Sequence, residues 1–149
     1  MDSRARPRRR HRGELYSTDR ASPLLSAFPN RHDEPVAHTA VVVDDHGPTR
    51  AVVCRLVELA GADVIAEAAD VAGTLAVVER LRPTVLVIDV QLPDGTGIDA
   101  ARMISAGPSP PRIVLMSTGD YGDGAGRCGA HAFIPKDQLS VAALMAAFE

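Results

Sequence analysis

Three aspartates stand where short apolar runs end, and their carboxylates are the clearest candidates for chemistry in this chain. Asp44 and Asp45 follow the run at 40–43, and Asp89 follows the run at 85–88. If the two runs form neighbouring parallel strands, the three carboxylates meet at one sheet edge, where like charges repel unless a cation compensates. Mg²⁺ prefers such oxygen ligands. The pattern therefore favours a magnesium site over the alternative that Asp44 and Asp45 only cap a helix, which leaves Asp89 unexplained.

Other reactive groups also follow apolar runs. Lys136, the only lysine among the 149 residues, comes after the run at 132–134, and Ser117 comes after the run at 113–116. His46 lies near the acidic edge and could be a ligand or a base there, but its position favours packing at a helix start, and His131 is interpreted as structural. The sequence holds no Ser-His-Asp or Cys-His arrangement that would indicate nucleophilic catalysis of the protease type.

The elements that must position these residues alternate between short apolar runs and amphipathic stretches. This alternation predicts strand–helix–strand units and a parallel sheet. Pro48 suits a first helical turn, Gly61 ends that helix, Asp70 is a plausible N-cap, and Pro83 stops the next helix. Strands are expected at 40–43, 64–66, 85–88, 113–116 and 132–134, and helices at 48–60, 70–82, 98–104 and 139–148, with a turn-rich loop at 93–97.

Right-handed crossovers place helices on both faces of such a sheet. The expected fold is therefore α/β, with a doubly wound five-stranded parallel sheet of order 2-1-3-4-5. In this topology, ligands bind at the carboxyl ends of the strands, where the strand order reverses. All the candidate residues above fall at those ends.

Four segments together resemble the signature segments of response-regulator receiver domains, which have a flavodoxin-like fold. The order and the spacing of the segments both match that family, and the resemblance covers residues 39–149. One segment alone would be weak evidence, but the combination is specific. The segments are Val-Val-Val-Asp-Asp-His at 41–46, Leu-Val-Ile-Asp-Val-Gln-Leu-Pro-Asp-Gly-Thr-Gly at 86–97, Val-Leu-Met-Ser-Thr at 114–118 and Phe-Ile-Pro-Lys at 133–136.

The resemblance implies a role for each matching position. Asp89 would take phosphate from a histidine kinase or phosphotransfer protein and form an acyl phosphate. Asp45 would be a direct Mg²⁺ ligand, Asp44 a ligand or the neighbour of one, and the backbone carbonyl of Gln91 a further ligand. Lys136 would pair with Asp89 before phosphorylation and with a phosphoryl oxygen afterwards.

The same resemblance implies a switch. Ser117, with Thr118 as a competitor one residue later, would donate its hydroxyl to the phosphoryl group. Phe133 occupies the position of a rotating aromatic in receivers, although it could equally be plain core. Movement of both would shift the population of a bistable surface formed by the fourth helix, fifth strand and fifth helix.

The stretch from 118 to 130 departs from the family. Its five glycines each cost a helix about 1 kcal/mol relative to alanine. We therefore expect a degenerate fourth helix that is short, frayed or absent, which puts the usual switching surface in doubt.

Residues 1–38 differ from the rest of the chain in composition and charge. They carry a net charge of +3 against −6 for residues 39–149, contain four prolines and lack periodicity. We expect a disordered basic extension before a receiver domain at 39–149. Cys54, expected to be a buried thiol, and the distant Cys128 form no disulfide framework, which favours a reduced cytoplasmic setting. No apolar run is long enough to span a membrane.

These observations predict a stand-alone phosphoacceptor receiver in a two-component phosphorelay. It would not be an enzyme beyond Mg²⁺-dependent self-phosphorylation and slow self-dephosphorylation, and it would signal by contact with a downstream protein. Homodimerisation is left open. One alternative is a pseudo-receiver that binds partners without being phosphorylated. Another is a regulator that contacts nucleic acid through the arginines at 4–12, with steep salt dependence.

Overall fold

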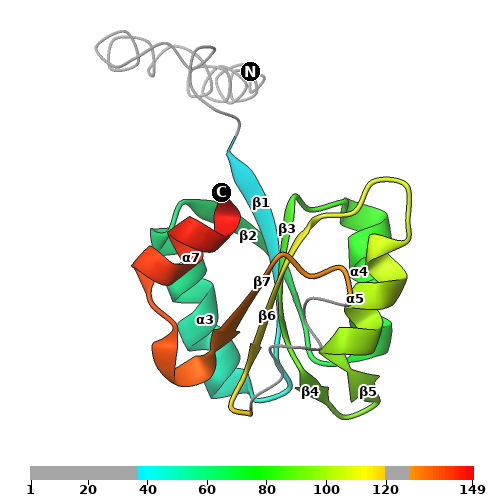
Figure 1. The fold of residues 1–149 in the computed structure, drawn as a ribbon, viewed down its shortest axis with the longest axis horizontal. Helices are drawn as coiled ribbons and strands as arrows, with labels where there is room; N and C mark the ends of the chain where they lie inside the picture. The colour runs from blue at the N-terminus through cyan, green and yellow to red at the C-terminus, as the bar shows by residue number, and fades with distance from the viewer. Residues whose placement is uncertain (1–36, 120–127) are drawn as a thin grey trace, which may run out of the picture. The chain divides into compact units, whose positions relative to one another are not determined.

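The computed structural model describes residues 37–119 and 128–149. Five parallel strands form its sheet in the order β2-β1-β3-β6-β7, which confirms the predicted order 2-1-3-4-5 (Figure 1). Two of the predictions, the disordered extension at 1–38 and the degenerate fourth helix within 118–130, fall largely on residues 1–36 and 120–127, which lie outside the described residues. His38, which was assigned to the extension, is instead the first residue of β1. The strands are β1 (His38–Val43), β2 (Ala62–Ala68), β3 (Val85–Asp89), β6 (Arg112–Ser117) and β7 (Ala132–Pro135).

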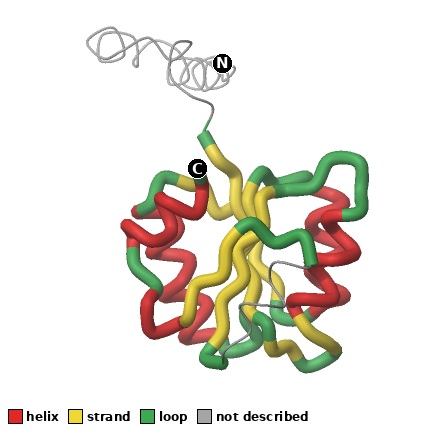
Figure 2. The backbone as a smooth tube through the Cα atoms, viewed as in Figure 1, coloured by secondary structure: helices red, strands yellow, loops and turns green. Residues whose placement is uncertain are grey.

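Helices cover both faces of this sheet, as a doubly wound fold requires. Figure 2 shows α3 and α7 on one side of the strands and α4 and α5 on the other. Two apolar clusters fill the two layers, one on each face of the sheet. All five residues of β3 are buried, as expected for a central strand covered on both faces. The helices are α3 (Gly47–Leu59), α4 (Val71–Leu81), α5 (Gly97–Ser105) and α7 (Val141–Phe148).

Side-chain caps fix where the helices begin. Asp70 accepts a hydrogen bond from the backbone N–H of Gly73 at 2.7 Å, which confirms the predicted N-cap of α4. Ser140 accepts from Ala143 at 3.0 Å, so α7 begins at Val141 rather than at the predicted residue 139. The residues before it instead form the 3₁₀ turn η3 (Lys136–Gln138). Such caps satisfy N–H groups that have no partner within the helix.

The predicted loop after Asp89 contains more structure than a turn. A small antiparallel pair, β4 (Gln91–Leu92) and β5 (Gly95–Thr96), forms there, with its tip at residues 93–94. At the base of this hairpin the backbone N–H of Gly97 donates to the carbonyl of Val90 at 2.7 Å. The loop that carries the chain away from the acidic edge therefore has its own hydrogen-bonded frame.

Gly97 packs so closely beneath β3 that no side chain fits there. A Cβ atom would overlap the carbonyl oxygen of Asp89 and lie 3.2 Å from Cγ1 of Ile88. Because the obstacle is backbone, Gly97→Ala should lower the free energy of unfolding by about 1–3 kcal/mol, the usual cost of overpacking. Urea denaturation measures the loss. Met103→Ala, a truncation on the exposed face of the same helix, should change stability by less than about 0.5 kcal/mol. Equal effects of the two substitutions would contradict this account.

Candidate functional site

The three predicted aspartates converge at the carboxyl edge of the sheet. β1 and β3 are paired in parallel, with Val43 opposite Ile88, so the residues after each strand end come together. One carboxylate oxygen from each of Asp44, Asp45 and Asp89 lies within 4.8 Å of the others. Asp44 is fully buried and Asp89 nearly so, whereas Asp45 is exposed. This edge therefore concentrates negative charge and leaves one side open to solvent.

Lys136 follows β7, the outer strand of the sheet, and its side chain reaches the acidic edge from there. Its Nζ lies 3.0 Å from Oδ2 of Asp89 and 2.8 Å from Oδ2 of Asp44. The resemblance had led us to expect a pairing with Asp89. The shorter contact with Asp44 was not foreseen, because it depends on how deeply the lysine side chain crosses the ends of β6 and β3.

Burial and pairing shift the ionisation of this group in opposite directions. Burial raises the pKa of Asp89, and the neighbouring Asp44 carboxylate adds to that effect, although the hydrogen bond and charge of Lys136 oppose it. For Lys136, burial disfavours the charged form, but its contacts with Asp44 and Asp89 outweigh burial and raise its pKa. The ammonium of Lys136 is therefore held in its charged form between the two buried carboxylates, where it offsets the repulsion between them.

The donor set suits a hard divalent cation. Oδ1 of Asp44 accepts a hydrogen bond from the backbone N–H of His46 at 2.9 Å, and Oδ1 of Asp89 accepts a longer one, 3.4 Å, from Gln91. Exposed Asp45 completes a set of three carboxylates facing one ammonium, which leaves two negative charges to be balanced when all three are ionised. An acidic cluster of this kind, made of oxygen ligands alone, is typical of a receiver magnesium site.

Ser117 and Thr118 differ sharply in their surroundings. Ser117 is the last residue of β6 and is fully buried, and its Oγ accepts a hydrogen bond from the backbone N–H of Gly119 at 3.0 Å. Thr118 is exposed beyond the strand. Phe133, in β7, is half-buried against the apolar cluster under α4 and α5. This placement suits both proposed interpretations of Phe133, as a moving aromatic and as plain core.

The remaining histidines and cysteines have structural surroundings. His46 caps α3, and its Nδ1 accepts a hydrogen bond from the backbone N–H of Thr49 at 3.3 Å, while His131 Nδ1 accepts from Ile113 at 3.0 Å. Cys54 was expected to be buried but is only partly so, because it lies at the margin of the α3 apolar face. Burial nevertheless raises its pKa to about 11, so the thiol is not activated.

Two residues near the site escaped the sequence analysis. Arg50 donates from Nη1 to the carbonyl of Asp44 at 2.7 Å and from Nε to Glu67 at 2.8 Å. Asp94 accepts hydrogen bonds from the backbone N–H groups of Val71 and Ala72 at 2.7 and 3.0 Å. Nothing in the sequence spacing indicates these contacts, because each joins elements that meet only in the folded chain.

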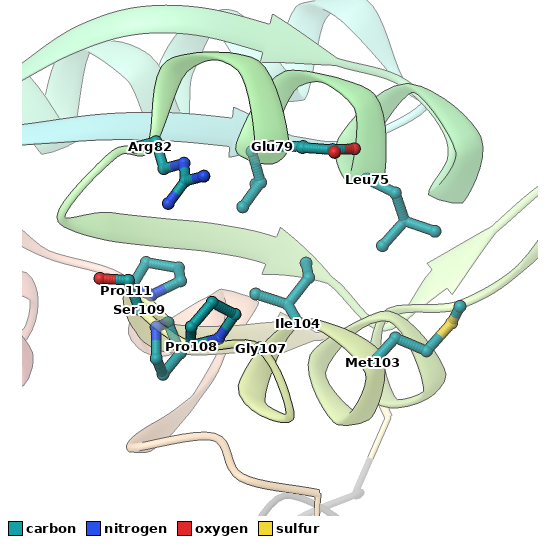
Figure 3. A pocket seen from close by; sticks show the side chains of 11 residues that line it. Leu75, Glu79, Arg82, Met103, Ile104, Gly107, Pro108, Ser109 and Pro111 are labelled. Carbon is teal, nitrogen blue, oxygen red and sulfur yellow. The ribbon is translucent and has the colours of Figure 1, made fainter.

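A groove of about 440 Å³ lies between α4 and α5, beside the segment 107–111. Figure 3 shows Leu75 facing Met103 and Ile104 across it, with Arg82 near one end. The groove is not lined by Asp44, Asp45, Asp89 or Lys136. It is therefore separate from the charged edge.

No helix within residues 37–119 and 128–149 has the length and apolar character needed to cross a membrane.

Comparison with known proteins agrees with this geometry. Residues 40–149 match the response regulator receiver domain family. The DNA-binding transcriptional activator DevR/DosR of Mycobacterium tuberculosis is 43% identical over 81 residues, which cover 51% of this chain and 36% of the relative. The solved signal receiver domain of the response regulator NarL from the same species is 29% identical with a TM-score of 0.70, covering 76% of this chain and 94% of that one.

A second curated relative, the transcriptional regulatory protein PdtaR of M. tuberculosis, is 28% identical over 119 residues, which cover 78% of this chain and 58% of the relative. The first three curated relatives are matched over about a third of their own length or less. The shared part is therefore the receiver portion of proteins that extend further.

Removal of the Lys136 ammonium should lower the free energy of unfolding, because the buried carboxylates then lack a compensating charge. Lys136→Met leaves Asp44 and Asp89 without their shared cation, and breaking a buried pair typically costs about 3 kcal/mol or more. Thermal unfolding in magnesium-free buffer measures the loss, and added Mg²⁺ should restore part of it. Arg102→Met, which removes an exposed pair with Asp99, should cost less than about 0.5 kcal/mol. Equal losses for the two variants would refute this interpretation.

The raised pKa of Asp89 also predicts a pH-dependent change in stability. Because the folded-state pKa exceeds the unfolded value, Asp89 destabilises the fold as pH rises through the folded-state pKa, and this effect vanishes below the unfolded pKa. Asp89→Asn should therefore raise the melting temperature at neutral pH, with a gain that shrinks on acidification. Asp63→Asn, which removes an exposed charge from β2, serves as the control in magnesium-free buffer. A gain that grew as pH fell would contradict the assignment.

Proposed function

The chain belongs to the response regulator receiver domains of two-component signalling, and we propose that it accepts a phosphoryl group on Asp89 from a histidine kinase or phosphotransfer protein. One observation carries the proposal. The carboxylates of Asp44, Asp45 and Asp89 gather within 4.8 Å, and Lys136 is bonded to two of them. A purely structural cluster of this kind would lack a reason to combine three carboxylates with a single lysine at a strand edge, since like charges repel.

The proposed step is a transfer between two covalent partners. A carboxylate oxygen of Asp89 attacks the phosphorus of a phosphohistidine, so that a P–O bond forms as the P–N bond breaks. The departing imidazole keeps the electron pair of that bond and takes up a proton. Later attack by water on the acyl phosphate would return the Asp89 carboxylate and release inorganic phosphate. This slow self-dephosphorylation is the only other reaction in the proposal.

The residues around Asp89 have complementary roles in this proposal. Asp45 and Asp44, with the backbone carbonyl of Gln91, would hold Mg²⁺, which when bound neutralises charge on the transferring group. Lys136 is already within 3.0 Å of Asp89 and would donate to a phosphoryl oxygen. Ser117, buried at the end of β6, is better placed than exposed Thr118 to donate its hydroxyl there.

The output would be a population shift at the protein surface. Phosphorylation would replace the single negative charge of the Asp89 carboxylate with about 1.5 to 2 negative charges and add three acceptor oxygens. If Ser117 turned toward it, the hydrogen bond that its Oγ now accepts from Gly119 would be released, and Phe133 in the neighbouring strand could repack. A downstream protein, or a second copy of this chain, would read the altered surface. The kinase and this receiver would meet at the acidic edge, where Asp45 is exposed.

Incubation with a small acyl phosphate donor and Mg²⁺ tests the proposal. Intact-protein mass spectrometry should show the addition of one phosphoryl group, and peptide mapping should place it on Asp89. Chelation of Mg²⁺ should abolish the addition, since without the cation the transferring group meets uncompensated carboxylates. Hydroxylamine should remove the group, as expected for an acyl phosphate.

Asp89→Asn should accept no phosphoryl group, whereas Asp63→Asn, with its substitution on the exposed edge strand, should accept as much as the wild type. A folded wild-type protein that gained no mass would refute the phosphoacceptor proposal. That outcome would favour a pseudo-receiver that binds its partner without phosphorylation.

A further inference from the structure

The hairpin that follows Asp89 is fastened at its tip as well as at its base. At the base, Gly97 donates to Val90, and Val90 in turn donates to the carbonyl of Met116 at 2.9 Å. At the tip, the two carboxylate oxygens of Asp94 accept from two successive backbone N–H groups of α4, at 2.7 and 3.0 Å. The backbone that contains Gln91 therefore lies between two anchors.

Asp94 does more than cap a helix, because α4 already has its own cap. Asp70 accepts from Gly73, and Asp94 takes only the preceding N–H groups, those of Val71 and Ala72. Local residues usually satisfy such first-turn donors. Here the second acceptor comes from 23 residues later in the chain, in a different loop. The two backbone donors lower the pKa of the Asp94 carboxyl, so the bridge is charged at neutral pH.

The hairpin also packs directly against the start of α4. Gly95, beside Asp94, has a φ of +157°, and a Cβ atom there would lie 3.3 Å from Cγ2 of Val71. α4 in turn follows β2, whose last residue, Ala68, accepts a hydrogen bond from the backbone N–H of Asp44 at 3.2 Å. Asp94 thus ties the loop after β3 to the start of α4, which follows the end of β2 that lies against Asp44.

We infer that Asp94 is a positioning residue for the Mg²⁺ and phosphoryl site, because it closes the connection between the backbones that carry Asp44 and Asp89. Lys136 joins the same two aspartates through their side chains. Without the Asp94 bridge, the hairpin keeps its base and its packing against Val71 but loses the hydrogen bonds at its tip, so the Gln91 backbone is held less firmly. This inference rests on the proposed function, since it assumes that Mg²⁺ binds at the acidic edge.

Mg²⁺ binding by the full chain, measured by titration calorimetry, tests the inference without any phosphorylation step. Asp94→Ala should weaken Mg²⁺ affinity about tenfold, the lower range seen when residues that orient metal ligands are removed. Asp94→Asn keeps one carbonyl oxygen as an acceptor and should fall between Asp94→Ala and the wild type. Amide hydrogen exchange at residues 91–97 should accelerate in Asp94→Ala.

Asp70→Ala is the matched control, because it removes a cap from the same helix without touching the hairpin. It should leave Mg²⁺ affinity within about twofold of wild type, well below the effect expected for a ligand-orienting residue. Equal weakening in both variants would reduce Asp94 to a helix cap and overturn the inference, as would unchanged affinity in Asp94→Ala or a wild type that binds no Mg²⁺. A wild type that binds Mg²⁺ but takes up no phosphoryl group would instead refute the proposed function and leave the role of Asp94 intact.

Discussion

The pairing of the Lys136 ammonium with the carboxylates of Asp44 and Asp89 is the interaction on which the acidic edge depends. Two carboxylates that are almost completely removed from water, Asp44 and Asp89, share this one cation at 2.8 and 3.0 Å. Burying ionised groups is costly unless they are paired and hydrogen-bonded. The pairing is available only because the strand order brings the ends of β1 and β3 together and places the end of β7 within reach of a long side chain. The charge pairing at this edge therefore depends on the topology of the sheet.

Contacts with the backbone carbonyl groups of Asp44 and Asp89 also stabilise this edge. Arg50 donates to the carbonyl of Asp44, and Gly97 fits beneath the carbonyl of Asp89 where a larger residue would not. These contacts fix the main chain from which the carboxylates project, whereas Lys136 fixes the carboxylates themselves. A site that accepts a metal ion and a phosphoryl group, as proposed here, would benefit from this division, because side chains can exchange partners while the backbone stays in place.

Elements could be predicted best where burial or capping determines which residue types occur at successive positions. The fully buried run of β3 and the Asp70 cap could be predicted because each depends on a few neighbouring residues. Ends of elements were less predictable: β2 spans Ala62–Ala68 rather than 64–66, since pairing with β1 extends it past the charged residues Asp63 and Glu67. The bridge made by Asp94 and the contact between Lys136 and Asp44 could not be predicted, because both join segments whose proximity exists only after folding.

Charge balance explains why one lysine would not suffice for this edge in the proposed phosphorylation cycle. Three ionised carboxylates and one ammonium leave two negative charges, and an acyl phosphate on Asp89 would replace the single negative charge of that carboxylate with about 1.5 to 2. If Lys136 followed the new phosphoryl oxygens, Asp44 would lose its cationic partner and keep the hydrogen bond from the backbone N–H of His46, while remaining fully buried. A divalent cation held by Asp45 and Asp44 would supply the missing charge at that position. In the proposed cycle, the shared contacts of Lys136 with both aspartates would thus belong to the unphosphorylated state, and Asp44 would be the residue whose pairing changes when Asp89 is phosphorylated.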